Sequence, residues 1–195
     1  MEIIKYNELA IEKVCEAIKM GVVAICPTDT VYGLIVDAVN KEAVDKIFET
    51  KKRDKAKAIS VFVRGIEEIK KFAFVNENQR KFLEENLPGK FTVILKKKPN
   101  CGLAENLFGG KETIGIRIIN NKIISDILGK INKPLTATSA NISGQPASGK
   151  IKEILEQFEN QEIKPDLVLD AGDLPESSPS KIIDLTCEKL KIIRK

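Results

Sequence analysis

Residues 21–34 read Gly-Val-Val-Ala-Ile-Cys-Pro-Thr-Asp-Thr-Val-Tyr-Gly-Leu, and the rest of the chain is organised around this stretch. Pro27 fixes its own φ angle and favours an extended Cys26, so the first apolar run is a strand that ends there. Three small polar residues follow, and Gly33 permits close backbone approach or positive φ where the chain packs again. By composition alone, this is an ordinary turn whose Thr and Asp side chains bond their own backbone.

The bulk composition is that of a globular protein. The chain has 195 residues, of which 43% are hydrophobic and 31% charged, enough for one domain with a substantial core. No apolar run reaches the roughly 18 residues needed to span a bilayer. The first residues lack the apolar segment and cleavage site of a signal peptide. We therefore expect a single domain over residues 1–195, located in the cytoplasm, with no membrane contact.

The chain contains no histidine and only four cysteines, none in a C-x-x-C pair. The lack of histidine excludes Ser-His-Asp and Cys-His catalysis and removes the commonest zinc ligand. We interpret the cysteines as reduced and structural, and we expect no dedicated metal site. An enzyme with this sequence would act mainly by positioning and charge.

The net charge is +4, and positive charge is concentrated in two short segments. Residues 51–57 hold five cations in seven positions, and residues 96–98 add three. Such runs are most often solvated, but they also suit an anionic ligand, either a nucleotide or RNA.

Strands and helices alternate irregularly along the chain, which predicts an α/β or α+β fold around a largely mixed sheet. Gly21 should stop a first helix, Asn40 should cap a second, and Gly129 should terminate a helix at 123–128. A short strand or irregular core is expected at 31–36 and a turn at 186–189. The other predicted strands are 22–26, 58–63, 91–95, 113–119, 135–138, 166–170, 180–184 and 190–194, and the other predicted helices are 65–71, 77–86 and 151–158.

The segment Pro-Thr-Asp-Thr-Val-Tyr-Gly-Leu at 27–34 resembles the opening motif of the threonylcarbamoyl-adenylate synthase family, the YrdC-type proteins. The resemblance implies one YrdC-like domain, with a twisted, open, mixed sheet flanked by helices and a concave basic groove. Further matches follow in family order at Lys51–Arg53, Pro88–Leu95, Thr113–Arg117, Thr138–Gly144 and Ser180–Asp184.

Lys51 and Arg53 are two residues apart, so a point charge and a planar fork could converge on one ligand. From this segment alone, charges solvated in a loop would explain them. The resemblance to the family's K-x-R motif instead assigns both a catalytic role at the ATP phosphates and places Lys57 at ATP. Asp54 and Ala58 stand where the family has prolines, which should loosen this loop.

Thr113 and Arg117 are four residues apart in a predicted strand, so both side chains point to the same face. The resemblance implies that Thr113 contacts the nucleotide and that Arg117 holds the carboxylate of L-threonine. It also places Thr30 and Ser180 at L-threonine and Arg194 at the nucleotide.

The segment 135–144 is a second polar turn after a strand, and it offers hydroxyls, an amide and free backbone N–H groups. Such a set suits an anion or a zwitterion without a metal cage, although alone it reads as a structural serine-rich turn. The resemblance implies that Ala137 and Ser148 contact ATP and that Ser139 contacts the amino acid. It assigns Asn141 and Ser143 to ordering the loop.

The resemblance implies an L-threonylcarbamoyladenylate synthase that uses L-threonine, bicarbonate and ATP, with Mg²⁺ arriving with ATP. Its product would pass to a tRNA threonylcarbamoyltransferase. A carbamate is already a competent nucleophile, so the site would need alignment and charge neutralisation rather than a strong base.

Two alternatives remain open from the sequence. One is a non-catalytic module that binds double-stranded RNA or tRNA through a basic surface, and RNA contact is also compatible with the enzyme. The other is an enzyme that forms a carbamoyl-adenylate. The few aromatic residues, eight Phe and two Tyr, argue against base stacking.

Overall fold

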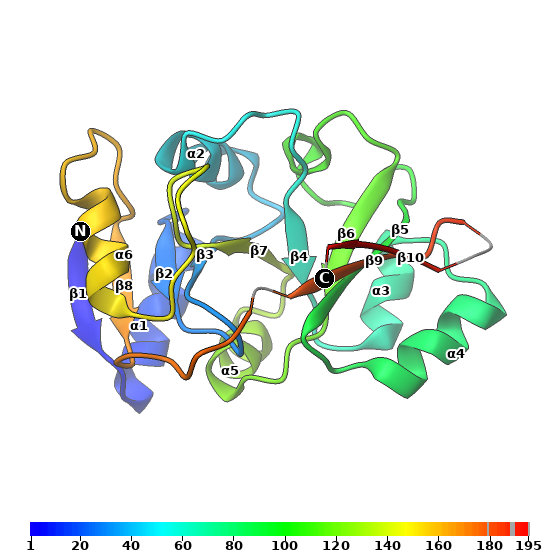
Figure 1. Cartoon of the computed structure of the whole chain (residues 1–195), viewed down its shortest axis with the longest axis horizontal. Helices are drawn as coiled ribbons and strands as arrows, with labels where there is room; N and C mark the ends of the chain where they lie inside the picture. Colours follow the sequence, from blue (N-terminus) through cyan, green and yellow to red (C-terminus); the bar gives the residue numbers. More distant parts are fainter. Residues whose placement is uncertain (179, 188–189, 195) are drawn as a thin grey trace.

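A computed structural model of the chain describes residues 1–178, 180–187 and 190–194. Within these residues, ten strands form one mixed sheet in the order β1-β8-β2-β3-β7-β4-β6-β5-β9-β10 (Figure 1). The strands are β1 (Glu2–Lys5), β2 (Ala24–Cys26), β3 (Gly33–Ile35), β4 (Ser60–Phe62), β5 (Phe91–Lys96), β6 (Thr113–Arg117), β7 (Leu135–Ser139), β8 (Leu167–Asp170), β9 (Lys181–Asp184) and β10 (Lys191–Arg194).

Asparagine side chains cap the start of four helices, because each accepts a hydrogen bond from the backbone N–H three residues on. The caps are Asn7, Asn40, Asn76 and Asn121. The helices are α1 (Glu8–Lys19), α2 (Lys41–Lys51), α3 (Ile66–Phe72), α4 (Glu77–Asn86), α5 (Lys122–Ile131) and α6 (Ile151–Glu159), with a 3₁₀ turn η1 (Glu105–Phe108).

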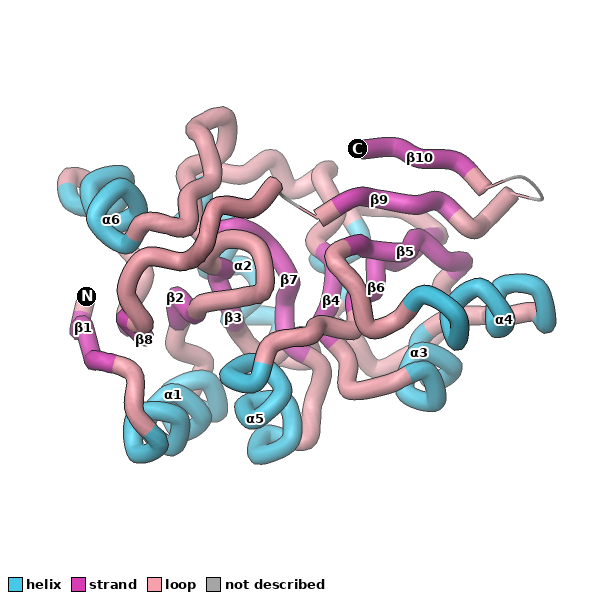
Figure 2. Tube along the Cα trace, turned by 60° about the horizontal axis from the view of Figure 1, so that its bottom comes forward, coloured by secondary structure: helices cyan, strands magenta, loops and turns pink. Residues whose placement is uncertain are grey.

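Two hydrophobic cores lie on opposite faces of the sheet. In β2, Ile25 packs in the core shared with α2 and α6, whereas Ala24 and Cys26 pack in the core shared with α1 and α5. The alternation follows from the two-residue period of a strand. Figure 2 shows α1 and α5 side by side on one face of the sheet. Helices therefore cover both faces, which leaves the ends of the central strands to form a site.

The mixed α/β class and most predicted elements are confirmed. The helix at 77–86 has the predicted bounds, and within 31–36 only Gly33–Ile35 is a strand. The stop at Gly129 is wrong, because α5 runs on to Ile131 and ends where Asn132 takes a left-handed φ of 56°. The apolar face of that helix outweighs the modest cost of one internal glycine. The turn predicted at 186–189 lies partly outside the described residues.

Candidate active site

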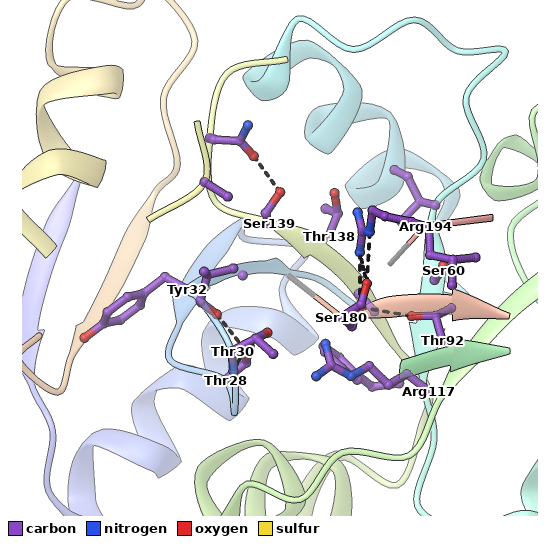
Figure 3. A pocket seen from close by; sticks show the side chains of 18 of the residues that line it. Thr28, Thr30, Tyr32, Ser60, Thr92, Arg117, Thr138, Ser139, Ser180 and Arg194 are labelled. Carbon is purple, nitrogen blue, oxygen red and sulfur yellow. Dashed lines mark hydrogen bonds between the residues drawn. The ribbon is translucent and has the colours of Figure 1, made fainter. Parts of the chain in front are cut away.

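A cavity of about 290 Å³ lies where the turn after β2, the ends of β7 and β6, and the start of β4 meet (Figure 3). Thr92, Ser180 and Arg194 close it from the other half of the sheet. Its described lining residues include three arginines, Arg53, Arg117 and Arg194, and no carboxylate. Such a site favours a ligand with several negative charges.

Hydrogen bonds between its own residues hold the turn after β2. Thr28 Oγ1 donates to the carbonyl of Val31 at 2.5 Å and accepts from the backbone N–H of Thr30 at 3.1 Å. Thr28 and Thr30 are both buried and both line the cavity. The turn therefore combines the local bonding expected of any Thr-Asp-Thr segment with a position at the cavity wall.

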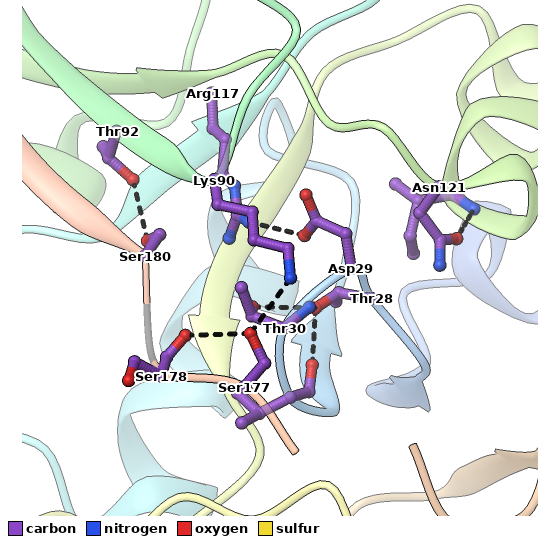
Figure 4. Close-up of polar contacts among 12 residues, drawn as sticks. Thr28, Asp29, Thr30, Lys90, Thr92, Arg117, Asn121, Ser177, Ser178 and Ser180 are labelled. Carbon is purple, nitrogen blue, oxygen red and sulfur yellow. Dashed lines mark hydrogen bonds and ion pairs between the residues drawn. The ribbon is translucent and has the colours of Figure 1, made fainter. Parts of the chain in front are cut away.

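Asp29 of this turn forms a buried ion pair with Arg117 at the end of β6. Nη2 of Arg117 lies 2.5 Å from Oδ1 of Asp29, and the side chains of Arg117 and Asp29 are only 6% and 7% exposed (Figure 4). Burial lowers the pKa of Arg117, while the charge of Asp29 opposes that shift. The guanidinium also lies 5.7 Å from the ring centre of Phe62. These contacts fix the arginine against the cavity.

Lys51 is almost completely buried at the end of α2 and lies outside the described cavity lining. Its ammonium donates to the carbonyl oxygens of Ser139 and Asn141 and to Oδ1 of Asn141, at 2.5, 2.8 and 2.9 Å. Burial, with the charge of Arg53 as a smaller cause, lowers the pKa of Lys51 to about 7. All three ammonium hydrogens are thus directed at the loop after β7.

Asn141 organises that loop. Its amide nitrogen donates to the carbonyls of Ile142 and Gln145, and its Oδ1 accepts from the hydroxyl of Ser139 at 2.6 Å. The backbone N–H of Ser143 donates to the carbonyl of Lys51, while its buried hydroxyl has no partner among the described residues. The loop is a hydrogen-bonded wall anchored on Lys51.

Arg53 lines the cavity and also holds the loop that follows α2. Its Nε donates to the carbonyl of Lys57 at 3.1 Å, and an Nη2 donates to that of Ala58 at 2.8 Å. The carboxylate of Asp54 accepts from the backbone N–H of Ala56. Hydrogen bonds therefore shape this loop at positions where prolines were expected from the resemblance. The side chain of Lys57 is exposed.

Ser180 and Arg194 form the opposite wall. Nε and Nη2 of Arg194 donate to the carbonyl of Ser180, and the hydroxyl of Ser180 lies 3.4 Å from that of Thr92. Burial lowers the pKa of Arg194. These contacts tie β10 to the start of β9 beside the cavity.

The fold brings eight of the thirteen predicted site residues to the cavity. Lys51, Lys57, Thr113 and Ser143 are outside its described lining, and Ser148 lines an adjoining hollow that shares Thr30, Val31 and Ala147 with it. The eight are Thr30, Arg53, Arg117, Ala137, Ser139, Asn141, Ser180 and Arg194.

Sequence reasoning missed several polar residues of the wall. Ser60 on β4 and Thr92 on β5 flank β6 from its two sides, and strand parity could have placed them, since the next residues, Val61 and Val93, are buried in the core. Tyr32 also lines the cavity, but its ring points away from the other labelled side chains (Figure 3), and its hydroxyl donates to the carbonyl of Gly172 at 2.6 Å. Burial raises the pKa of Tyr32 to about 12. The partner of Arg117, Asp29, carried no sequence signal beyond its place in the turn.

Among the described residues, no group of three or more His, Cys, Asp or Glu side chains could hold a metal ion. None of the helices in that part of the chain is long and apolar enough to cross a membrane.

A family model named for Sua5, YciO and YrdC, and described as "Telomere recombination", matches residues 16–195. The chain belongs to the Sua5/YciO/YrdC family. A Methanocaldococcus jannaschii protein of this family, provisionally named a threonylcarbamoyl-AMP synthase, is 39% identical over 100% of this chain and 91% of its own length. The expected family membership is therefore confirmed.

Two solved structures of the family share the fold. Pyrococcus abyssi Sua5 complexed with L-threonine has 26% identity and a TM-score of 0.89, covering 99% of this chain and 56% of its own. Escherichia coli YciO has 25% identity and a TM-score of 0.86, covering 100% of this chain and 94% of its own. The chain thus spans little more than half of Sua5 but nearly all of YciO.

Proposed function

We propose that this chain is an L-threonylcarbamoyladenylate synthase, a nucleotidyltransferase that converts L-threonine, bicarbonate and ATP to threonylcarbamoyl-AMP and pyrophosphate. The product would serve a tRNA threonylcarbamoyltransferase that modifies adenosine 37 of ANN-decoding tRNAs in the cytoplasm. One observation carries the proposal: three arginines and a set of hydroxyls surround one cavity in a chain similar to a Sua5 that was solved with L-threonine.

The amino-acid half of the site would lie around Arg117. The guanidinium is held in place by Asp29 and would bind the carboxylate of threonine through a charge-assisted hydrogen bond. Thr30, Ser139 and Ser180 add hydroxyls to the same cavity and would orient the rest of the substrate.

The nucleotide half would lie around Arg53 and Arg194, whose charges suit the phosphates of ATP. Ala137 lines the same wall, and Ser148 lines the adjoining hollow, where part of the nucleotide would extend. Thr113 lies further along β6 and would act only at the edge of the site. Mg²⁺, arriving with ATP, would add positive charge at the phosphates.

The chemistry needs alignment more than proton transfer. The neutral amine of threonine and bicarbonate would form a carbamate with loss of water, and a carbamate oxygen would attack the α-phosphorus as pyrophosphate leaves. The arginines would neutralise the growing charge, and the buried walls would exclude water.

Lys51 takes a different role in this proposal from the one that the K-x-R motif implied. Its ammonium is enclosed by the loop at 139–141, so it would position Ser139 and Asn141 rather than touch ATP. Lys57 is exposed and would reach the nucleotide only after a change in its loop.

Pyrophosphate release tests the proposal when each substrate is omitted in turn. We expect release only with ATP, L-threonine and bicarbonate together. Release with ATP and a carbamoyl donor in place of threonine and bicarbonate would indicate the carbamoyl-adenylate alternative. Failure to release pyrophosphate, together with salt-dependent binding of double-stranded RNA, would indicate the non-catalytic module.

A further inference from the structure

The ion pair between Asp29 and Arg117 leaves one atom of each partner without a hydrogen bond. Oδ2 of Asp29 and Nε of Arg117 are shielded from solvent and have no partner among the described residues. A buried polar atom without a partner destabilises the protein, and a charged group does so more strongly. A ligand that supplies a donor to Asp29 and an acceptor to Arg117 would satisfy both atoms.

Thr30 adds a second free acceptor beside Asp29. The hydroxyl of Thr28 gives its one hydrogen to the carbonyl of Val31, so in its 3.2 Å contact with Thr30 it must accept. The hydroxyl of Thr30 therefore donates its hydrogen to Thr28, and its oxygen can accept a hydrogen bond from a ligand in the cavity that Thr30 lines. Asp29 is not itself a lining residue, but it lies between two of them, next to Thr30 in sequence and paired with Arg117, so two successive side chains of this turn offer acceptors at the cavity wall (Figure 4).

We propose that Asp29, assisted by Thr30, recognises the amino group of the substrate while Arg117 takes its carboxylate. Asp29 is then a specificity-determining residue that selects an α-amino acid over a simple carboxylic acid. This inference rests on the proposed function, because it concerns the amino-acid half of that site.

Charge explains the selection. A ligand with only a carboxylate gains the contact with Arg117 but places its negative charge near Asp29. A zwitterion brings a positive group to Asp29 and a negative group to Arg117, so both members of the buried pair gain a partner. Asp29 is the carboxylate in direct contact with the cavity's arginines among the described ion pairs.

The first test uses the unaltered protein. Calorimetric titration compares L-threonine with 3-hydroxybutanoate of the same configuration at C3, which lacks only the amino group. We expect the hydroxy acid to bind about tenfold more weakly or worse, because a hydrogen bond to a charged group is lost. Equal affinity for the two ligands would overturn the inference without any variant.

The second test is Asp29→Asn, which keeps the shape and an oxygen for Arg117 but removes the charge. We expect the Kd for L-threonine to rise about tenfold while that for 3-hydroxybutanoate stays the same or falls. Asp37→Asn is the matched control, since Asp37 is equally buried in an ion pair but its partner, Lys133, is not a lining residue of the cavity, whereas Arg117 is. Equal weakening of both ligands would show that Asp29 only orients Arg117.

The failure of the proposed function is distinguishable from failure of the inference. If the protein binds another L-α-amino acid but not threonine, the synthase assignment fails, and the same comparison is made with that amino acid and its deaminated analogue. If none of the L-α-amino acids binds, both fail.

Discussion

The ammonium of Lys51 lies 2.8 Å from the carbonyl oxygen of Asn141 and 2.9 Å from its side-chain Oδ1, across 90 residues of sequence. This contact joins the end of α2 to the loop after β7. Because Asn141 in turn bonds Ser139, Ile142 and Gln145, one buried cation fixes a whole wall of the cavity.

Lys51→Met should therefore lower both stability and activity. The variant keeps the apolar stem but leaves three oxygens without their donor, and we expect the free energy of unfolding to fall by about 3 kcal/mol. Hydrogen exchange should quicken at 139–147, and urea unfolding measures the stability loss. The exposed Lys41→Ala on the same helix is the control. Unchanged exchange in the loop would contradict this role.

The stability of the protein should also depend on pH through Lys51. Burial lowers the pKa of this lysine to about 7 in the folded chain, against 10.5 ordinarily. Between these values the unfolded chain binds the proton that the folded chain has lost, so the free energy of unfolding should rise with pH. The slope is at most about 1.4 kcal/mol per pH unit, and it vanishes below about pH 7, where both states are protonated.

Urea unfolding of the wild type and Lys51→Met from pH 6 to pH 10 measures this effect. The stability difference between them should change above pH 7 in favour of the wild type. Parallel curves over the whole range would exclude Lys51 as the titrating group.

Local chemistry explains why much of the fold was predictable. The helix at 77–86 follows an Asn76 whose side chain and the partner Gln79 form a complete capping box, so its start is encoded within four residues. In α5, by contrast, the stop expected at Gly129 failed, because burial of Ile127, Leu128 and Ile131 decides that helix through contacts far away in sequence. Ile131 lies four residues after Ile127 and three after Leu128, so the apolar spacing, rather than the glycine, indicates where this helix ends.

The site likewise contains features that the sequence predicts and features that it does not. Arg117 was predictable as a cavity residue, since it is a cation on a strand among apolar neighbours. Its pairing with Asp29 was not, because 88 residues separate them and only the sheet order brings them together. Lys51 and Arg53 looked equivalent in sequence, yet the end of α2 between them sends one side chain into the loop and the other to the cavity.

Arg117→Ala should raise the Kd for threonine by about tenfold or more and leave ATP binding nearly intact, because it removes a charge-assisted carboxylate contact. It should also cost about 3 kcal/mol of stability, since Asp29 is left buried and unpaired. Separate titrations of ATP and threonine test the first effect. Equal loss of both affinities would contradict the assignment.

A second substitution tests why Arg117→Ala should lose stability. Adding Asp29→Asn to Arg117→Ala removes the unpaired charge, so the double variant should be more stable than Arg117→Ala alone. Arg64→Ala, which breaks the partly buried pair with Glu68 away from the cavity, serves for comparison. A double variant less stable than either single one would mean that the pair does not govern stability here.

Arg53→Ala should depress turnover more than threonine binding, because its charge acts on the phosphates in the transition state. A fall in kcat of about 100-fold is expected by analogy with removing one preorganised donor. Steady-state pyrophosphate release measures it. Arg80→Ala, which removes an exposed pair with Glu84, is the control and should retain activity. Wild-type turnover in Arg53→Ala would show that this arginine only holds the loop through its bonds to Lys57 and Ala58.

The loop at 51–58 supplies the last prediction. Asp54 and Ala58 replace the prolines implied by the resemblance, and the loop instead depends on hydrogen bonds from Arg53 to the carbonyls of Lys57 and Ala58. Binding of phosphates by Arg53 would compete with those two bonds and so release the loop. Without prolines the released loop has more conformational freedom, so ordering it over the nucleotide should cost conformational entropy. We expect faster hydrogen exchange at 51–58 in the empty protein than with ATP and threonine bound.

Ala58→Pro should then tighten ATP binding several-fold without touching a ligand contact. A compatible proline contributes about 0.4–1 kcal/mol by restricting the unfolded or disordered chain. Among the described residues, the Ala58 N–H donates to no backbone carbonyl outside the regular elements, so proline would break no such bond, although its ring must fit beside the closely packed backbone of Gly109. Calorimetry of ATP binding measures the gain. If exchange across 51–58 in the empty protein is already as slow as in β5, the loop is preordered and the proline should bring no gain in affinity.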